Sequence, residues 1–247
     1  HRLEALAKLT GREHYVDDLP LDEFLWGATV RSPAPRGRIT ALRFDPSVDW
    51  SQFTIVDHRD IPGPNVIALI ERDQPVLAPG YVRHVQEAVL LLAHPDRMAL
   101  RRAVAAVTIE VALEPAILDF RVRPEPAQIQ YGTDNELKHL TIVKGDVEGA
   151  LVNAPIVVVG TYETGAQEHV YLEPQGMIAE LDGDVLVLRG SMQCPYYVLK
   201  ALMAPLGRDE RRLRVIQTPT GGGFGGKEED PSTIALHAAL LALKSGR

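Results

Sequence analysis

The chain has 247 residues, of which 45% are hydrophobic and 24% are charged, and its formal net charge is −7. This is the composition of an ordinary globular protein, large enough for one big domain or two smaller ones. Basic residues form no patch, so no nucleic-acid partner is indicated. No apolar run approaches the roughly 18 residues that a membrane helix needs, so no membrane partner is indicated.

The chain has a single cysteine, Cys194. One cysteine cannot support a disulfide scaffold, and we expect a reducing, cytoplasmic location. One cysteine also cannot ligate an iron–sulfur cluster, which takes four ligands. Between Gln193 and Pro195, Cys194 is interpreted as a small packing residue and not as a nucleophile. The first ten residues lack both a starting Met and a signal-peptide core, and we expect the sequence to begin inside a longer chain.

The first 123 residues predict a module of mixed strands and one helix. The run 88–93 is continuously apolar, which is typical of a strand buried on both faces. Strands are predicted by their β-forming residues at 24–30, 39–44, 53–56, 88–93 and 108–113, and a helix at 98–107. Strands and a helix mixed in this way indicate an α+β fold.

Residues 124–134 are a linker by composition, and a second segment, 135–247, follows it. Asp182-Gly183-Asp184 is a turn between two β-forming runs and predicts a hairpin. The other elements predicted in this segment are a helical turn after 145–148, a strand at 155–160 extended through 164, a helix at 195–205, a strand at 213–216 and a helix at 231–242.

The stretch 221–228 reads GGGFGGKE, with five glycines in six positions between the predicted strand and helix. Glycine lets a backbone take positive φ and approach a ligand closely. A strand, a glycine loop and a helix N-terminus would direct backbone N–H groups at an anionic or electron-rich ligand. A ligand-free glycine turn is the alternative that the density of glycine disfavours.

Two common nucleotide motifs fit this loop in part. Gly221-x-Gly223-x-x-Gly226 matches the dinucleotide fingerprint, but no acidic residue follows at the required distance of about 20 positions. Gly221 to Lys227 matches most of a phosphate loop, but Glu228 stands where Ser or Thr should hold Mg²⁺. A nucleotide-binding protein stays an alternative, and magnesium-dependent nucleotide binding would identify it.

The loop resembles the GGGFGGKE loop of the molybdenum hydroxylases, the xanthine dehydrogenase and aldehyde oxidase family. Residues 167–175, QEHVYLEPQ, resemble that family's QEHxYLEPQ segment, and the order and separation of the two motifs match the family. Further landmarks that resemble the family's α/β hammerhead domain lie at 11–18, 31–33, 60–63 and 82–93. One departure is His84 to Ala88, where the family often has Gly-Gln-Pro and a hydrophobic residue.

The resemblance implies a fold in which an α/β hammerhead domain, 1–123, precedes the first part of a molybdopterin-binding domain, 135–247. It implies part of a molybdenum hydroxylase that hydroxylates an N-heterocycle or an aldehyde with oxygen from water. The family's base glutamate lies beyond Arg247, so we expect no catalytic residue in this chain and no activity of the chain alone. We also expect the predicted strand 213–216 and helix 231–242 to leave apolar surface uncovered.

The resemblance also assigns cofactors, partners and site residues. Molybdenum–molybdopterin would be shared with the remainder of the large subunit, and 2Fe-2S clusters and FAD would lie on other domains or chains. Gln167 would lie beside the molybdenum's oxygen ligands. Phe224 would lie against the molybdenum–pterin site, with Gly223 and Gly225 in close approach, and Glu228 would contact a small-molecule substrate.

The charged neighbours of these residues have structural interpretations. Lys227 is interpreted as structural or as a long-range attractor of anions. Glu168, His169 and Glu173 are expected to form a hydrogen-bond network, because Pro174 disfavours the helix that a His169–Glu173 metal pair would need. An alternative function for the whole chain is a structural or assembly component that has lost the cofactor.

Overall fold

Strand β5, Ala88–His94, is buried along its whole length, as its continuous apolar run predicts. In the computed structural model, which describes residues 4–67 and 72–247, β5 is the central strand of a three-stranded antiparallel sheet. Its neighbours are β1, Trp26–Arg31, and β3, Thr54–Val56, in the order β1-β5-β3. Leu90, Leu91 and Leu92 are fully covered, which places this strand in the core.

A second three-stranded antiparallel sheet accompanies the first, in the order β4-β2-β6. Its strands are β4, Tyr81–Val82; β2, Gly37–Phe44; and β6, Val107–Leu113. Helix α2, Arg97–Ala105, begins where the Asp96 carboxylate accepts hydrogen bonds from the N–H groups of Met98 and Ala99. The predicted helix end at 107 is wrong, because β6 already begins at Val107 and pairs there with Phe44.

A third sheet carries the glycine loop. Its order is β7-β8-β9, with β7 and β8 antiparallel and β8 and β9 parallel. The strands are β7, Met177–Asp182; β8, Val185–Gly190; and β9, Leu213–Gln217. Helix α4, Pro195–Leu206, forms the crossover, with Pro195 in its first turn and Gly207 in a left-handed cap. The predicted hairpin, helix and strand are confirmed here.

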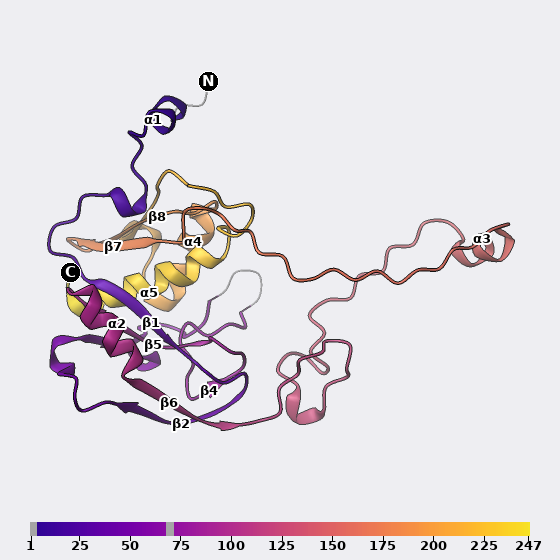
Figure 1. The fold of residues 1–247 in the computed structure, drawn as a ribbon, viewed down its shortest axis with the longest axis horizontal. Coiled ribbons are helices and arrows are strands. Elements are labelled where there is room, and N and C mark those ends of the chain that lie inside the picture. The colour runs from indigo at the N-terminus through magenta and orange to yellow at the C-terminus, as the bar shows by residue number, and fades with distance from the viewer. Residues whose placement is uncertain (1–3, 68–71) are drawn as a thin grey trace. The chain divides into compact units, whose positions relative to one another are not determined.

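Helix α5, Asp230–Ser245, lies between the third sheet and the β1-β5-β3 sheet and contacts both (Figure 1). Ala235, Leu236 and Ala239 on this helix are completely buried. The predicted helix is confirmed, but the expectation that it leaves apolar surface uncovered is wrong, because the two sheets and α4 cover it. Its N-terminus follows the glycine loop, so the loop stands on a rigid, buried support.

The chain divides into two compact units, one of His1–Glu114 with His169–Arg247 and one of Pro115–Glu168. In the second unit, Asp146 caps helix α3, Val147–Asn153, which confirms the predicted helical turn. The predicted strand at 155–164 is wrong for this structure, because these residues join no sheet. The division of the sequence into 1–123, 124–134 and 135–247 stays a prediction.

Short helical elements complete the fold. Helix α1 is Ala5–Leu9, and single turns of 3-10 helix lie at Val16–Asp18, Trp50–Gln52, His58–Asp60, Pro126–Gln128 and Glu210–Arg212. Across the described ranges, no helix combines the length and the apolarity that crossing a membrane requires.

Candidate cofactor-binding loop

The glycine loop runs from the end of β9 to the start of α5 and contains three residues in the left-handed region. They are Gly222 at φ 102°, Phe224 at φ 52° and Gly225 at φ 95°. Glycine adopts these angles without strain, whereas an aromatic residue there is an uncommon conformation that the surroundings must enforce. The loop therefore holds Phe224 in a fixed and costly geometry, with its side chain 76% exposed.

Other glycines are required because the 169–175 segment lies directly against the loop. A Cβ atom on Gly221 would lie 2.5 Å from Cβ of Glu173. A Cβ atom on Gly226 would lie 2.7 Å from Cε1 of Tyr171. Both distances are shorter than van der Waals contact, so the two sequence motifs pack backbone to side chain with no room for a larger residue.

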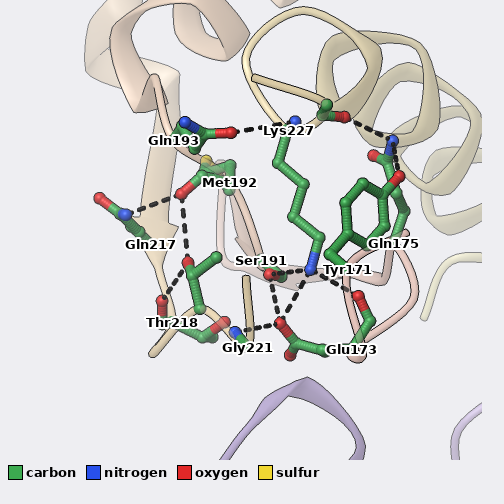
Figure 2. Close-up of polar contacts among 12 residues, drawn as sticks. Tyr171, Glu173, Gln175, Ser191, Met192, Gln193, Gln217, Thr218, Gly221 and Lys227 are labelled. Carbon is green, nitrogen blue, oxygen red and sulfur yellow. Dashed lines mark hydrogen bonds and ion pairs between the residues drawn. The ribbon is translucent and has the colours of Figure 1, made fainter. Parts of the chain in front are cut away.

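Lys227 joins the two motifs through a buried ammonium group (Figure 2). Its Nζ donates to the backbone oxygen of Glu173 at 2.7 Å, to Oε2 of Glu173 at 3.0 Å and to Oγ of Ser191 at 2.9 Å. The same Nζ lies 4.6 Å from the centre of the Tyr171 ring. All three N–H bonds of the ammonium are thus satisfied and the charge is paired, which a fully buried lysine requires.

Glu173 is the anion of this network. Its Oε2 also accepts hydrogen bonds from Oγ of Ser191 at 2.6 Å and from the N–H of Gly221 at 2.7 Å. Burial by itself raises the pKa of Glu173, but the hydrogen bonds from Ser191 and Gly221 and the ammonium of Lys227 outweigh it and hold the pKa below its usual value. Glu173 is therefore ionised at neutral pH, and its carboxylate fixes the first glycine of the loop.

Two glutamines hold the remainder of the loop by its backbone (Figure 2). Oε1 of Gln193 accepts from the N–H of Gly225 at 3.1 Å and of Lys227 at 3.2 Å. Nε2 of Gln175 donates to the carbonyl of Gly226 at 3.0 Å. These amides replace the sheet or helix hydrogen bonds that an irregular backbone lacks.

The loop leaves a row of donors unused. Among the described residues, none accepts a hydrogen bond from the backbone N–H of Gly222, Gly223 or Phe224. Glu228, at the end of the loop, is half-buried, whereas Glu229 is exposed. Consecutive free N–H groups next to an exposed aromatic ring suit a ligand that carries acceptor oxygens and a planar ring system, such as molybdopterin. The loop fits the cofactor that the sequence resemblance implies.

The structure places four of the five predicted site residues, Gly223, Phe224, Gly225 and Glu228, on this one loop. Gln167 is exposed and belongs to the unit Pro115–Glu168. The hydrogen-bond role expected of Glu173 is confirmed, and so is the structural role of Lys227. Cys194 is half-buried at the start of α4, outside the network.

The sequence analysis missed Ser191 and Gln193, which hold Lys227 and the loop backbone. Both lie between the two motifs, just after β8. The signal that could have found them is a pair of polar residues directly after a predicted buried strand, where the loops of the same sheet meet.

Two family models match consecutive parts of the chain. The model for the "Aldehyde oxidase and xanthine dehydrogenase, a/b hammerhead domain" matches residues 10–115. The model for the "Molybdopterin cofactor-binding domain" matches residues 129–247, which include the glycine loop. The expected order of domains is therefore confirmed.

Similar proteins carry the same assignment. The nicotinate dehydrogenase large molybdopterin subunit of Eubacterium barkeri is 30% identical over 97% of this chain, which covers 57% of that protein. A probable xanthine dehydrogenase subunit of Bacillus subtilis is 32% identical over all of this chain, which covers 33% of that protein. An aldehyde oxidoreductase from Desulfovibrio gigas has the same fold, with a TM-score of 0.88 and 23% identity over 100% of this chain and 29% of that one.

The chain thus spans between about a third and somewhat more than half of the relatives that it matches in sequence. The hammerhead model, the cofactor-binding model and the open glycine loop agree with one another. The chain belongs to the xanthine dehydrogenase and aldehyde oxidase family of molybdenum hydroxylases.

Proposed function

We propose that this chain is part of a molybdenum-dependent oxidoreductase that hydroxylates a nitrogen heterocycle with oxygen from water. Nicotinate and xanthine, the compounds named in the two sequence relatives, are both nitrogen heterocycles. They support this substrate class over an aldehyde, the other class that the family resemblance implies. Molybdenum–molybdopterin, when bound, would supply the two-electron oxidation.

The observation that carries the proposal is the free donor row of the glycine loop. The N–H groups of Gly222, Gly223 and Phe224 are held in place by bonds to neighbouring loop atoms, and they need no rearrangement to bind an acceptor. Such preorganised donors cost little entropy when a ligand arrives. The backbone of Gly225 is not crowded, since even an added Cβ atom would lie 3.5 Å from its nearest neighbour, Nε2 of His169. A cofactor could therefore approach the backbone at that point.

Two side chains have proposed roles at the reacting end. Glu228 is half-buried and carries a carboxylate, which could accept a hydrogen bond from a ring N–H of the substrate or pass a proton. Gln167 carries an amide that donates and accepts without adding charge, and we propose that it hydrogen-bonds the molybdenum's ligand shell. The exposed Phe224 ring would pack against a planar ligand.

The proposal includes partners. The base for the reaction, the remaining cofactor-binding polypeptide, and the iron–sulfur and FAD groups would come from other parts of the enzyme. We therefore propose that the 247 residues alone are inactive.

The test is metal analysis of the protein purified from its native host, with the co-purifying chains identified by mass. We expect molybdenum and iron in the assembly, and incorporation of ¹⁸O from labelled water into nicotinate or xanthine. Absence of molybdenum from an intact assembly would overturn the proposal and favour a structural or assembly role.

A further inference from the structure

The segment 156–164 is extended and has no partner. Among the described residues, none forms a backbone–backbone hydrogen bond with any residue from 156 to 164. Every side chain in this run is exposed, including Val158 at 86%, Val159 at 91% and Tyr162 at 90%. Backbone polar groups and large apolar side chains are thus all uncovered in one stretch.

The residue types of this segment are those of a buried strand. The run Ile-Val-Val-Val at 156–159 is followed by Thr, Tyr and Thr, and Glu163 is the only charged residue. Such residues have the highest preference for strands. Ile156 and Val158 would occupy one face, and Val157 and Val159 the other, so both faces are apolar. Strands with two apolar faces lie in the interior of a sheet that is covered on both sides.

The segment also lacks the devices that protect an edge strand. It has no lysine, no inward-pointing charge and no proline after Pro155. Left uncovered, a run of about nine such residues, on the order of 30 Å when extended, would pair with other chains and aggregate. The sequence is therefore built for a strand that has a neighbour on each side.

We infer that residues 156–164 form a central strand of a sheet that is completed by polypeptide of the same large subunit outside these 247 residues. The sequence relatives support this occupant, because the match covers 97–100% of this chain but only 57% and 33% of those proteins. A second copy of this chain would supply one strand neighbour at a two-fold axis and no covering layer for either face. The inference rests on the proposed place in a larger subunit and is independent of molybdenum.

Hydrogen exchange of the assembly purified from the native host tests this directly. We expect the amides of 156–164 to exchange at least about 100-fold more slowly than in an unstructured peptide, because ladder hydrogen bonds protect them. Exchange at the unprotected rate in the intact assembly would overturn the inference. Protection in particles that contain only copies of this chain would also overturn it, in favour of self-pairing.

A matched pair of variants tests the strand pairing. Val158→Pro removes a backbone donor from the middle of the strand, whereas Val158→Thr keeps the branched shape and the donor. We expect Val158→Pro to lower recovery of the remaining large-subunit polypeptide at least tenfold, and Val158→Thr to leave it within about twofold. Protection of β5 amides reports that the hammerhead part stays folded in both. Equal recovery with both variants would contradict the inference, and neither readout depends on metal content or turnover, which test the proposed function.

Discussion

The ammonium of Lys227 lies 3.0 Å from the carboxylate of Glu173, although the two residues are 54 positions apart and belong to separate motifs. The lysine side chain is fully buried and the glutamate side chain is 16% exposed. The pair makes the glycine loop and the 169–175 segment one structural unit. The cofactor-facing geometry of the loop therefore depends on a charge pair that touches no ligand.

Lys227→Met should loosen the loop strongly. The substitution keeps the chain's bulk but leaves the Glu173 carboxylate buried without its cation, which costs about 3–5 kcal/mol for a pair of this kind. Native-state hydrogen exchange of residues 221–229 would measure the loss as a lower free energy of local opening. Glu173→Gln removes the opposite charge, and adding it to Lys227→Met should recover part of that loss.

The pairing itself is tested by additivity. If the losses of the two single variants simply add in the double variant, the charges do not interact, and the described network is wrong.

Gly226→Ala should disturb the loop by steric overlap. The new methyl group would lie 2.7 Å from Cε1 of Tyr171 and 2.9 Å from Nδ1 of His169, so backbone or ring must move. Increased protease cleavage within 221–229 would report the movement. Gly165→Ala is the control, since a methyl group there has no neighbour within 4 Å. Equal cleavage of the two variants would show that Gly226 is not held against Tyr171.

His237 on α5 should make stability depend on pH. Its Nε2 lies 3.3 Å from the carbonyl of Val76 and its Nδ1 lies 3.1 Å from Oγ1 of Thr29, an arrangement that suits the neutral ring. Burial is the main cause that lowers the pKa of His237 from 6.5 to about 4. The unfolded chain therefore binds a proton below about pH 6.5 that the folded chain refuses until about pH 4. Stability should be full above pH 6.5 and fall, by about 3 kcal/mol, as the pH drops from 6.5 to 4.

Urea unfolding between pH 7.5 and pH 4 measures this dependence. His237→Gln, which cannot take up a proton, should flatten the curve in that window. A wild-type curve already flat from pH 6.5 to 4.5 would contradict the neutral, buried state of His237. The lowered pKa of Glu173 adds a further loss only below the usual carboxyl range, because protonation then removes its charge.

Glu228 and Glu229 are adjacent carboxylates with different predicted roles. We expect Glu228→Ala to lower kcat/KM for the heterocyclic substrate about 100-fold, the low end for a group that transfers or orients a proton. Glu229→Ala should have little effect, because its side chain faces solvent. Steady-state kinetics of the native enzyme with each variant decides the matter, and equal losses would remove Glu228 from the proposed site.

Local elements of this fold could be predicted from the sequence because their signals are local. The hairpin around Gly183, the helix that begins at Pro195 and the buried strand β5 follow from turn residues, helix starts and an apolar run. The end of α2 at Ala105 could not be predicted in this way. Pairing of Val107 with Phe44 on β2 decides it, and that contact is distant in sequence.

The candidate site was predicted in its position but not in its support. The glycine loop and the 167–175 motif are visible as residue patterns, whereas the joining of Lys227 to Ser191 and Glu173 depends on how β8, β9 and the loop meet. The strand expected at 155–164 shows the opposite limit. Its residues favour a strand, but a strand forms only where a neighbour offers hydrogen bonds, and no described residue does so.

The most direct test of the account is elemental analysis for molybdenum in the assembly purified from the native host, before and after Lys227→Met. The account predicts molybdenum in the wild-type assembly together with polypeptide that completes the cofactor-binding domain, and a clear loss of molybdenum in the variant. An intact wild-type assembly without molybdenum would contradict the account, because the open glycine loop would then be held in place for no such ligand.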